Sequence, residues 1–168
     1  LPGYGLAETT LIVTACRADR EPRISNHPTA GTLVSSGAPL AGVSIRITDP
    51  ESGASLPPGA TGEIRVKAPV VSQGYWQRPE ETRRVFGDDG ELRTGDLGYM
   101  EDGELFVSGR IKDLIIIDGT NHSPDDIEGA AMAAAPEITA AAAFPTEADG
   151  RESASLAIEA AGLAEADR

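Results

Sequence analysis

Three short clusters in this chain combine residue types that could bind a nucleotide. The first, GYGLAETT at residues 3–10, places an aromatic ring between two glycines, ahead of a carboxylate and hydroxyls. Gly5 would let a ligand approach the backbone, Tyr4 offers a stacking face, and Glu8 could bind a hard cation such as Mg²⁺. Together these groups suit a nucleotide with its metal. A glycine turn beside a solvated acid would account for the same residues without any ligand.

The second cluster, LRTGDLG at residues 92–98, carries a single carboxylate between glycines. Asp96 can only accept hydrogen bonds, and its two oxygens would suit the paired hydroxyls of a ribose. Acidic residues bind ribose in this way in dinucleotide-binding folds. An aspartate that stabilises its own turn is the simpler interpretation when this cluster is taken alone.

The third cluster is the most informative segment of the chain, GRIKDLIIIDGTNHSPDDIE at residues 109–128. Arg110 could donate several hydrogen bonds in a fixed fork to sugar hydroxyls or a phosphate, whereas Lys112 is a flexible point charge. Both come just before Leu114–Ile117, an apolar run that predicts a buried strand. Charges at the mouth of a buried strand could form a site or a hinge, or could be ordinary solvated charges at a strand end.

Composition narrows the functional class. The chain has 168 residues, 40% of them hydrophobic, which is enough for a globular core of one domain or slightly more. A net charge of −13 with scattered basic residues argues against nucleic acid as a partner. Cys16 is the single cysteine, the two histidines offer no zinc spacing with it, and no apolar run approaches the roughly 20 residues of a membrane span. We therefore expect a cytoplasmic protein, and the start at Leu1 without signal-peptide features predicts that the chain begins within a longer protein.

Local patterns predict mostly short strands before residue 110. Val43–Ile47 and Glu63–Lys67 alternate apolar and polar residues, as strands with one wet face do. Pro79–Phe86 has proline first, then acidic and then basic residues, which favours a short helix. Asp102-Gly103 between two strand-like runs predicts a tight hairpin.

The pattern changes after residue 113. Ser123 followed by Pro124 and two acidic residues predicts a helix that begins there and ends near Ala135. The apolar run Ile138–Phe144 fits either a helix by propensity or a buried strand by its length and flanking prolines, and Ser153–Ile158 predicts a further strand. This shift in composition places a domain boundary near residues 110–113.

Taken in order, the clusters are far more specific than they are singly. YGLAETT is followed by GEIRVKAPVVSQGYWQRPEET, then by LRTGDLG, and then by GRIKDLIIIDGTNHSPDDIE. This succession resembles the adenylate-forming superfamily of acyl-CoA synthetases, nonribosomal-peptide adenylation domains and fatty acyl-AMP ligases. It is most similar to the fatty acyl-AMP ligases, because Ala7 stands where most relatives carry Thr and because KDLII and the residues after it have their form. The resemblance covers nearly the whole chain.

The resemblance implies a role for each candidate residue. Tyr4 and Gly5 match the aromatic-glycine motif, so Tyr4 would stack on adenine, and Glu8 would help to bind Mg²⁺. Asp96 would hold the ribose hydroxyls of ATP. Arg110 matches the arginine that shares the ribose.

The resemblance also implies a domain organisation. The fold would be α+β: residues 1–109 would form the β-rich, distorted barrel-like end of a large AMP-binding domain, and residues 114–168 the start of a small α/β C-terminal subdomain. Residues 110–113 would be the hinge, with Lys112 as the pivot about which the subdomain swings between half-reactions. The loop around Gly119 would approach the second acceptor.

The implied reaction activates a fatty carboxylate with ATP and Mg²⁺, releases pyrophosphate and passes the acyl group to the phosphopantetheine thiol of an acyl carrier protein. Coenzyme A is the less favoured acceptor, and an acyl-CoA synthetase or another carboxylate-adenylating domain is the alternative. An alternative of another class is a non-catalytic module that binds a nucleotide or a carrier protein. The family's phosphate loop would lie before Leu1 and its C-terminal catalytic lysine beyond Arg168, so we expect the 168 residues alone to be inactive.

Overall fold

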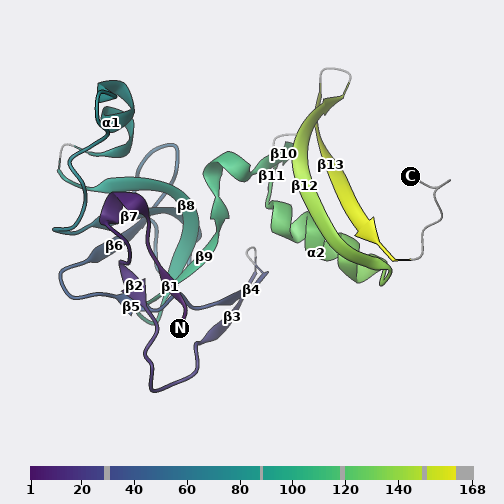
Figure 1. The fold of residues 1–168 in the computed structure, drawn as a ribbon, viewed down its shortest axis with the longest axis horizontal. Helices are drawn as coiled ribbons and strands as arrows, with labels where there is room; N and C mark the ends of the chain where they lie inside the picture. The colour runs from purple at the N-terminus through teal and green to yellow at the C-terminus, as the bar shows by residue number, and fades with distance from the viewer. Residues whose placement is uncertain (29–30, 88, 118–119, 149–150, 162–168) are drawn as a thin grey trace. The chain divides into compact units, whose positions relative to one another are not determined.

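A computed structural model of the chain describes residues 1–28, 31–87, 89–117, 120–148 and 151–161. It divides into two compact units, Leu1–Ile111 and Lys112–Arg168 (Figure 1). Strands predominate in both units, and each unit carries one α-helix among its described residues. The predicted α+β class is confirmed.

A four-stranded antiparallel sheet is the centre of the first unit (Figure 1). Its strands, in spatial order, are β6 (Ser44–Thr48), β7 (Gly62–Lys67), β8 (Leu92–Glu101) and β9 (Glu104–Arg110). The buried residues of the core cluster come mainly from this sheet: Val13, Ile47, Ile64, Val66, Leu92 and Leu105. Burying these aliphatic side chains supplies the main stabilising term for the unit.

Shorter strands surround the central sheet. β1 (Gly3–Tyr4), β2 (Thr14–Ala15) and β5 (Ala38–Pro39) form one small sheet, and β3 (Ile24–His27) pairs with β4 (Gly31–Val34). The Leu105 backbone on β9 accepts a hydrogen bond from the Ser36 N–H and donates one to the Gly37 carbonyl, at 2.7 and 2.9 Å. These bonds join the edge of the large sheet to the segment that leads into β5.

The hairpin between β8 and β9 has the predicted turn. Glu101 pairs with Glu104, which leaves Asp102 and Gly103 as a two-residue loop with φ of 48° and 80°. Positive φ at both positions is the requirement of a type I′ turn, and Asp-Gly meets it at low cost. The short helix is confirmed as well, as α1 (Pro79–Val85), with two glutamates in its first turn and two arginines in its last.

One prediction for β7 was wrong in part. The strand exists, but its polar face is not wet at Glu63, which is only 2% exposed. The carboxylate is buried because Arg65 and Arg93 form ion pairs with it. Sequence alternation cannot distinguish a solvated polar face from a face of mutually paired charges.

The second unit begins in η2 (Ile111–Asp113), a single 3₁₀ turn. β10 (Ile115–Ile117) pairs with β11 (Thr120–His122), and β12 (Ile138–Ala148) pairs with β13 (Arg151–Ala160) as a long hairpin. The helix α2 (Pro124–Ala134) lies along this hairpin, against β12 (Figure 1). The alanine-rich run after Pro136 is therefore a strand, because pairing with β13 overrides the helical propensity of alanine.

Two expectations for the second unit need correction. Ser123 occupies the N-cap position of α2, but its side chain makes no capping hydrogen bond. Of the apolar run Leu114–Ile117, Ile115 is fully buried whereas Ile116 is 40% exposed, because neighbouring residues of a strand point to opposite faces. None of the described helices has the length and apolar character needed to cross a membrane.

Candidate functional site

The predicted ribose-binding segment is an irregularity in the central sheet. Glu63 pairs with Leu97, and Arg65 pairs with Arg93, so three residues of β8, Thr94–Asp96, oppose Ile64 alone. Gly95 adopts φ of 72°, a conformation that residues with a Cβ rarely accept. Such bulges bend a strand and redirect its side chains, and they are common beside active sites. We call residues 94–96 the β8 bulge.

The hydroxyl group of Thr94 holds the β8 bulge in place. Thr94 donates its Oγ1 hydrogen to the Ile64 carbonyl at 2.7 Å, and the same oxygen accepts the Asp96 N–H at 3.0 Å. Thr94 thus ties the extra residues to β7 and fixes the backbone that carries Asp96.

Asp96 lies between two of the other predicted residues. The Tyr4 hydroxyl donates to Asp96 Oδ2 at 2.7 Å, and Arg110 Nε lies 2.9 Å from Asp96 Oδ1. Arg110 is the direct cross-strand partner of Asp96 at the end of β9, which explains the second contact. The structure therefore brings Tyr4, Asp96 and Arg110 together from β1, β8 and β9.

The Tyr4 phenol is a neutral donor in this cluster. Burial, reinforced by the neighbouring Asp96 carboxylate, raises the pKa of the Tyr4 phenol above its ordinary value of 10.0. Asp96 is 5% exposed, so its carboxylate is almost withdrawn from water. A carboxylate oxygen can accept more than one hydrogen bond, which leaves acceptor capacity on both Asp96 oxygens for a ligand with paired hydroxyls.

Gly5 has a packing role that the sequence did not reveal. A Cβ at this position would lie 1.6 Å from the Leu11 carbonyl oxygen. The glycine is required because the chain doubles back at η1 (Ala7–Thr9), and the Val13 N–H donates to the Tyr4 carbonyl at 2.8 Å. Gly5 thus allows the close approach of backbone to backbone that places Tyr4.

Glu8 lies in η1 and has a partner that sequence reasoning missed. The Tyr75 hydroxyl donates to Glu8 Oε1 at 2.5 Å, and the Ser72 N–H donates to the Glu8 carbonyl at 2.7 Å. Burial and the Glu8 carboxylate raise the pKa of Tyr75 to about 12, so this phenol also stays protonated at neutral pH. The only sequence signal for Tyr75 was its place in the SQGYW segment.

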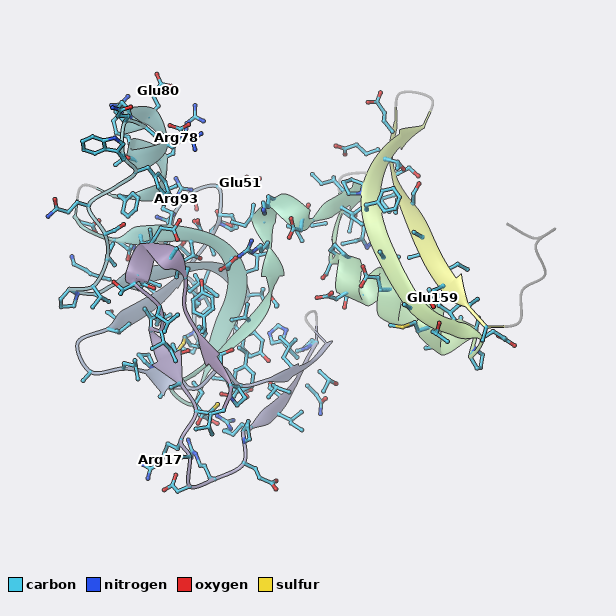
Figure 2. All side chains as sticks on the ribbon, viewed as in Figure 1. Arg17, Glu51, Arg78, Glu80, Arg93 and Glu159 are labelled. Atoms are coloured by element: carbon cyan, nitrogen blue, oxygen red, sulfur yellow. The ribbon has the colours of Figure 1, made fainter. Side chains whose placement is uncertain are left out.

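The loop that carries Tyr75 is anchored to α1. The Tyr75 N–H donates to Thr82 Oγ1 at 2.9 Å, and the same hydroxyl donates to the Arg78 carbonyl at 2.8 Å. The Tyr75 ring meets Phe86 edge-on at 5.4 Å between centroids. Figure 2 labels Arg78, the residue just before this helix, and Glu80 in its first turn.

The donor set around Glu8 fits a divalent cation only in part. Among the described residues there is no group of three or more His, Cys, Asp or Glu side chains that could enclose a metal. Mg²⁺ typically takes one or two carboxylates together with substrate phosphates and water. Glu8 therefore fits as the protein ligand of a cation that a nucleotide also holds.

The remaining predicted residues lie outside this cluster. Lys112 is exposed, in η2, and is the first residue of the second unit. The loop around Gly119 lies outside the described residues. The candidate site of the first unit thus has two parts. Tyr4, Asp96 and Arg110 form one cluster, with Gly5 supporting Tyr4. Glu8, bonded to Tyr75, is the other part.

Comparison with known proteins gives the family of the chain. Residues 1–76 match the AMP-binding enzyme family. The chain is 42% identical to the long-chain-fatty-acid–AMP ligase FadD26 of Mycobacterium tuberculosis, over 87% of this chain and 30% of that protein. It is 40% identical to the putative fatty-acid–CoA ligase FadD25 of the same organism, over 84% of this chain and 29% of that protein. The chain therefore spans about a third of the length of these relatives.

Solved structures show the same similarity. ATP-bound MatB from Rhodopseudomonas palustris matches with a TM-score of 0.80 and 37% identity, over 97% of this chain and 31% of MatB. A structure from a study of fatty acyl-adenylate ligases of E. coli and L. pneumophila matches with a TM-score of 0.79 and 32% identity, over 99% of this chain and 33% of the other. With the ordered motifs and this level of identity, the chain belongs to the adenylate-forming superfamily and carries part of its AMP-binding region.

Proposed function

We propose that this chain is the part of an ATP-dependent fatty acyl-AMP ligase that binds the nucleoside and carries the hinge. The observation that best supports the proposal is that Tyr4 and Arg110, which lie far apart in the sequence, both contact the Asp96 carboxylate. The chain covers about 30% of FadD26, so the complete activity would require further segments.

Each residue of the candidate site would bind a different part of the nucleotide. The Tyr4 ring would stack on adenine, while Asp96 would accept hydrogen bonds from the ribose hydroxyls and Arg110 would share the sugar. These contacts fix the nucleoside and hence the direction in which its triphosphate points. Positioning of this kind supplies much of the rate enhancement in such a transfer.

The proposed reaction joins a fatty carboxylate to AMP. A carboxylate oxygen attacks the α-phosphorus of ATP, the bond from that phosphorus to the β-phosphate oxygen breaks, and pyrophosphate leaves with the bonding electrons. Glu8, held by Tyr75, would bind Mg²⁺ together with the phosphates. When bound, the ion would neutralise charge that builds up on the leaving group.

We further propose residues 110–113 as the hinge, with residues 1–109 and 114–168 as the parts it joins and Lys112 as its pivot. The change from one compact unit to the next at Ile111 and Lys112 supports this assignment. The acceptor would be the phosphopantetheine thiol of an acyl carrier protein. A cytoplasmic location remains a prediction from the single cysteine and the composition.

An acyl-CoA synthetase is the second candidate. It is favoured by the 40% identity to FadD25, which is described as a putative fatty-acid–CoA ligase. The two candidates share the first half-reaction and differ only in the thiol that receives the acyl group.

The test is to incubate the longer protein that carries this chain with ATP, Mg²⁺ and a panel of fatty acids, and to identify products by mass spectrometry. We expect acyl-AMP and pyrophosphate, followed by acyl transfer when a phosphopantetheinylated carrier protein is added. Acyl-CoA formed on addition of coenzyme A would select the second candidate. Absence of any acyl-AMP, with ATP still bound, would point to a non-catalytic module.

The isolated 168 residues give a complementary test. We expect them to release no pyrophosphate from ATP and fatty acids, because the matched region is only 30% of FadD26 and the isolated residues would lack the rest. Release of pyrophosphate that depends on both substrates would contradict this expectation.

A further inference from the structure

Glu63 is a buried carboxylate for which the proposed reaction has no use. It lies in β7, is 2% exposed and contacts the backbone of the β8 bulge. A buried acid is costly unless charges and hydrogen bonds compensate it. Its partners therefore indicate what it does.

Glu63 contacts the β8 bulge directly and through the residue before it. Its Oε1 accepts a long hydrogen bond from the Gly95 N–H at 3.4 Å, and its Oε2 lies 3.6 Å from Arg93 Nε. Arg93 ends the regular part of β8 just before the bulge and is labelled in Figure 2. The carboxylate thus holds the bulge at its start and at its middle.

Glu63 is itself held by an ion pair with Arg65, two residues along the same strand. Its Oε2 lies 2.9 Å from Arg65 Nε, and Arg65 Nη1 lies 3.9 Å from Glu91 Oε2. Glu91 in turn is paired with Arg46. Arg46, Arg65 and Arg93 lie opposite one another across β6, β7 and β8, and the two glutamates offset two of the three positive charges in this row.

Glu63 and Glu91 differ in their contact with the β8 bulge. Both are buried and both pair with arginines of the row, at 2% and 8% exposure. Only Glu63 contacts the backbone of the bulge, because Gly95 donates to it and to no other side chain among the described residues. A comparison of substitutions at Glu63 and at Glu91 therefore separates an effect on the bulge from an effect on the charge network.

We propose that Glu63 is a positioning residue that sets the direction of the Asp96 carboxylate by holding the β8 bulge. The proposal rests on the proposed function, in which Asp96 binds the ribose of ATP. The bulge has a positive φ at Gly95 and interrupts the register between β7 and β8, and side chains hold its backbone. Thr94 fixes its first residue and Glu63 its second.

The test compares Glu63→Gln with the matched control Glu91→Gln in the longer protein. The functional readout is the ratio of kcat/KM for ATP to that for 3′-deoxy-ATP in pyrophosphate release. Hydrogen bonds to a charged group contribute on the order of 1.5–3 kcal/mol, so we expect a ratio of about 10–100 in the unaltered protein. We expect Glu63→Gln to lower it to about threefold or less, mainly through KM for ATP, and Glu91→Gln to leave it unchanged.

A structural readout makes the test independent of activity. Hydrogen exchange of the peptide that covers residues 92–98 should become faster in Glu63→Gln and stay as it was in Glu91→Gln. Thermal unfolding of both variants should show that each is folded and similarly destabilised. Glu63→Leu removes both the charge and the acceptor. If this variant folds, its exchange over residues 92–98 should be faster than that of Glu63→Gln.

The outcomes are distinct. Unchanged exchange and an unchanged ratio in folded Glu63→Gln would overturn the proposal. An equal loss of ribose discrimination in Glu91→Gln would also overturn it, because the effect would then belong to the whole charge network. If the unaltered protein neither binds nor turns over ATP while exchange rises in Glu63→Gln alone, the proposed function fails and only the support of the bulge by Glu63 survives.

Discussion

At the scale of single residues, two tyrosine hydroxyls hold the two carboxylates of the candidate site. Tyr4 donates to Asp96 and Tyr75 donates to Glu8. Tyr99 is the third tyrosine; it is fully buried, and its hydroxyl makes no hydrogen bond among the described residues. Tyr99→Phe is therefore a suitable control for the loss of either hydroxyl.

Tyr4→Phe should keep the ring and lose the bond to Asp96. We expect a loss of about 1–2 kcal/mol in the free energy of unfolding, measured by urea titration, and a rise of several-fold in KM for ATP. Because burial raises the pKa of Tyr4 above 10.0, the stability it adds is fully present below pH 10.0 and is lost as pH rises through the raised pKa. The difference in stability between the unaltered protein and Tyr4→Phe should therefore vanish only at strongly alkaline pH. A difference that disappears near neutral pH would contradict this.

Tyr75→Phe should weaken the cation site that we propose at Glu8. Outer partners of metal ligands typically contribute 10–100-fold to metal affinity, so we expect roughly tenfold weaker Mn²⁺ binding, measured by paramagnetic resonance with a non-hydrolysable ATP analogue. Glu8→Gln should weaken it at least as much, because it removes the charged ligand itself. Tyr99→Phe should bind Mn²⁺ normally, and equal weakening in all three variants would remove Glu8 as the ligand.

At the scale of elements, the site depends on places where regular structure is interrupted. Asp96 lies in the β8 bulge opposite Arg110, and the close approach of the backbone at Gly5 lies where β1 pairs with β2. These interruptions place side chains that an uninterrupted strand would direct elsewhere.

Gly5→Ala should therefore be damaging although Gly5 is exposed. Its Cβ would meet the Leu11 carbonyl at 1.6 Å, so the backbone must move, and we expect a loss of about 1–3 kcal/mol in the free energy of unfolding together with weaker ATP binding. Gly129→Ala is the control: it lies inside α2 with open space around its Cβ, and should stabilise the helix by roughly 0.5–1 kcal/mol. Calorimetry would show both effects, and a stabilised Gly5→Ala would contradict the first.

At the scale of the whole molecule, the chain passes from one compact unit to the other between Ile111 and Lys112. If Lys112 is a pivot, a residue that restricts backbone rotation there should separate the two half-reactions. Proline fixes its own φ and restricts the residue before it.

Lys112→Pro should therefore form acyl-AMP at a nearly normal rate and pass the acyl group to the acceptor thiol at least tenfold more slowly. Single-turnover measurements of pyrophosphate release and of thioester formation would separate the steps. Lys112→Ala keeps the backbone free and is the control. Equal slowing of both steps by the proline would count against a pivot at this residue.

The sequence by itself determined the features that depend on neighbouring residues. The Asp102-Gly103 hairpin, the helix that begins at Pro124 and the order of the motifs were all readable, because turn geometry, helix starts and the family resemblance are encoded locally. Only the tertiary structure decided what meets across the chain. Tyr4 and Asp96 are 92 residues apart, and Glu8 and Tyr75 are 67 apart, so no local pattern could pair them. The strand after Pro136 and the burial of Glu63 were likewise decided by pairing partners, since strand pairing and charge neutralisation override local propensity and polarity.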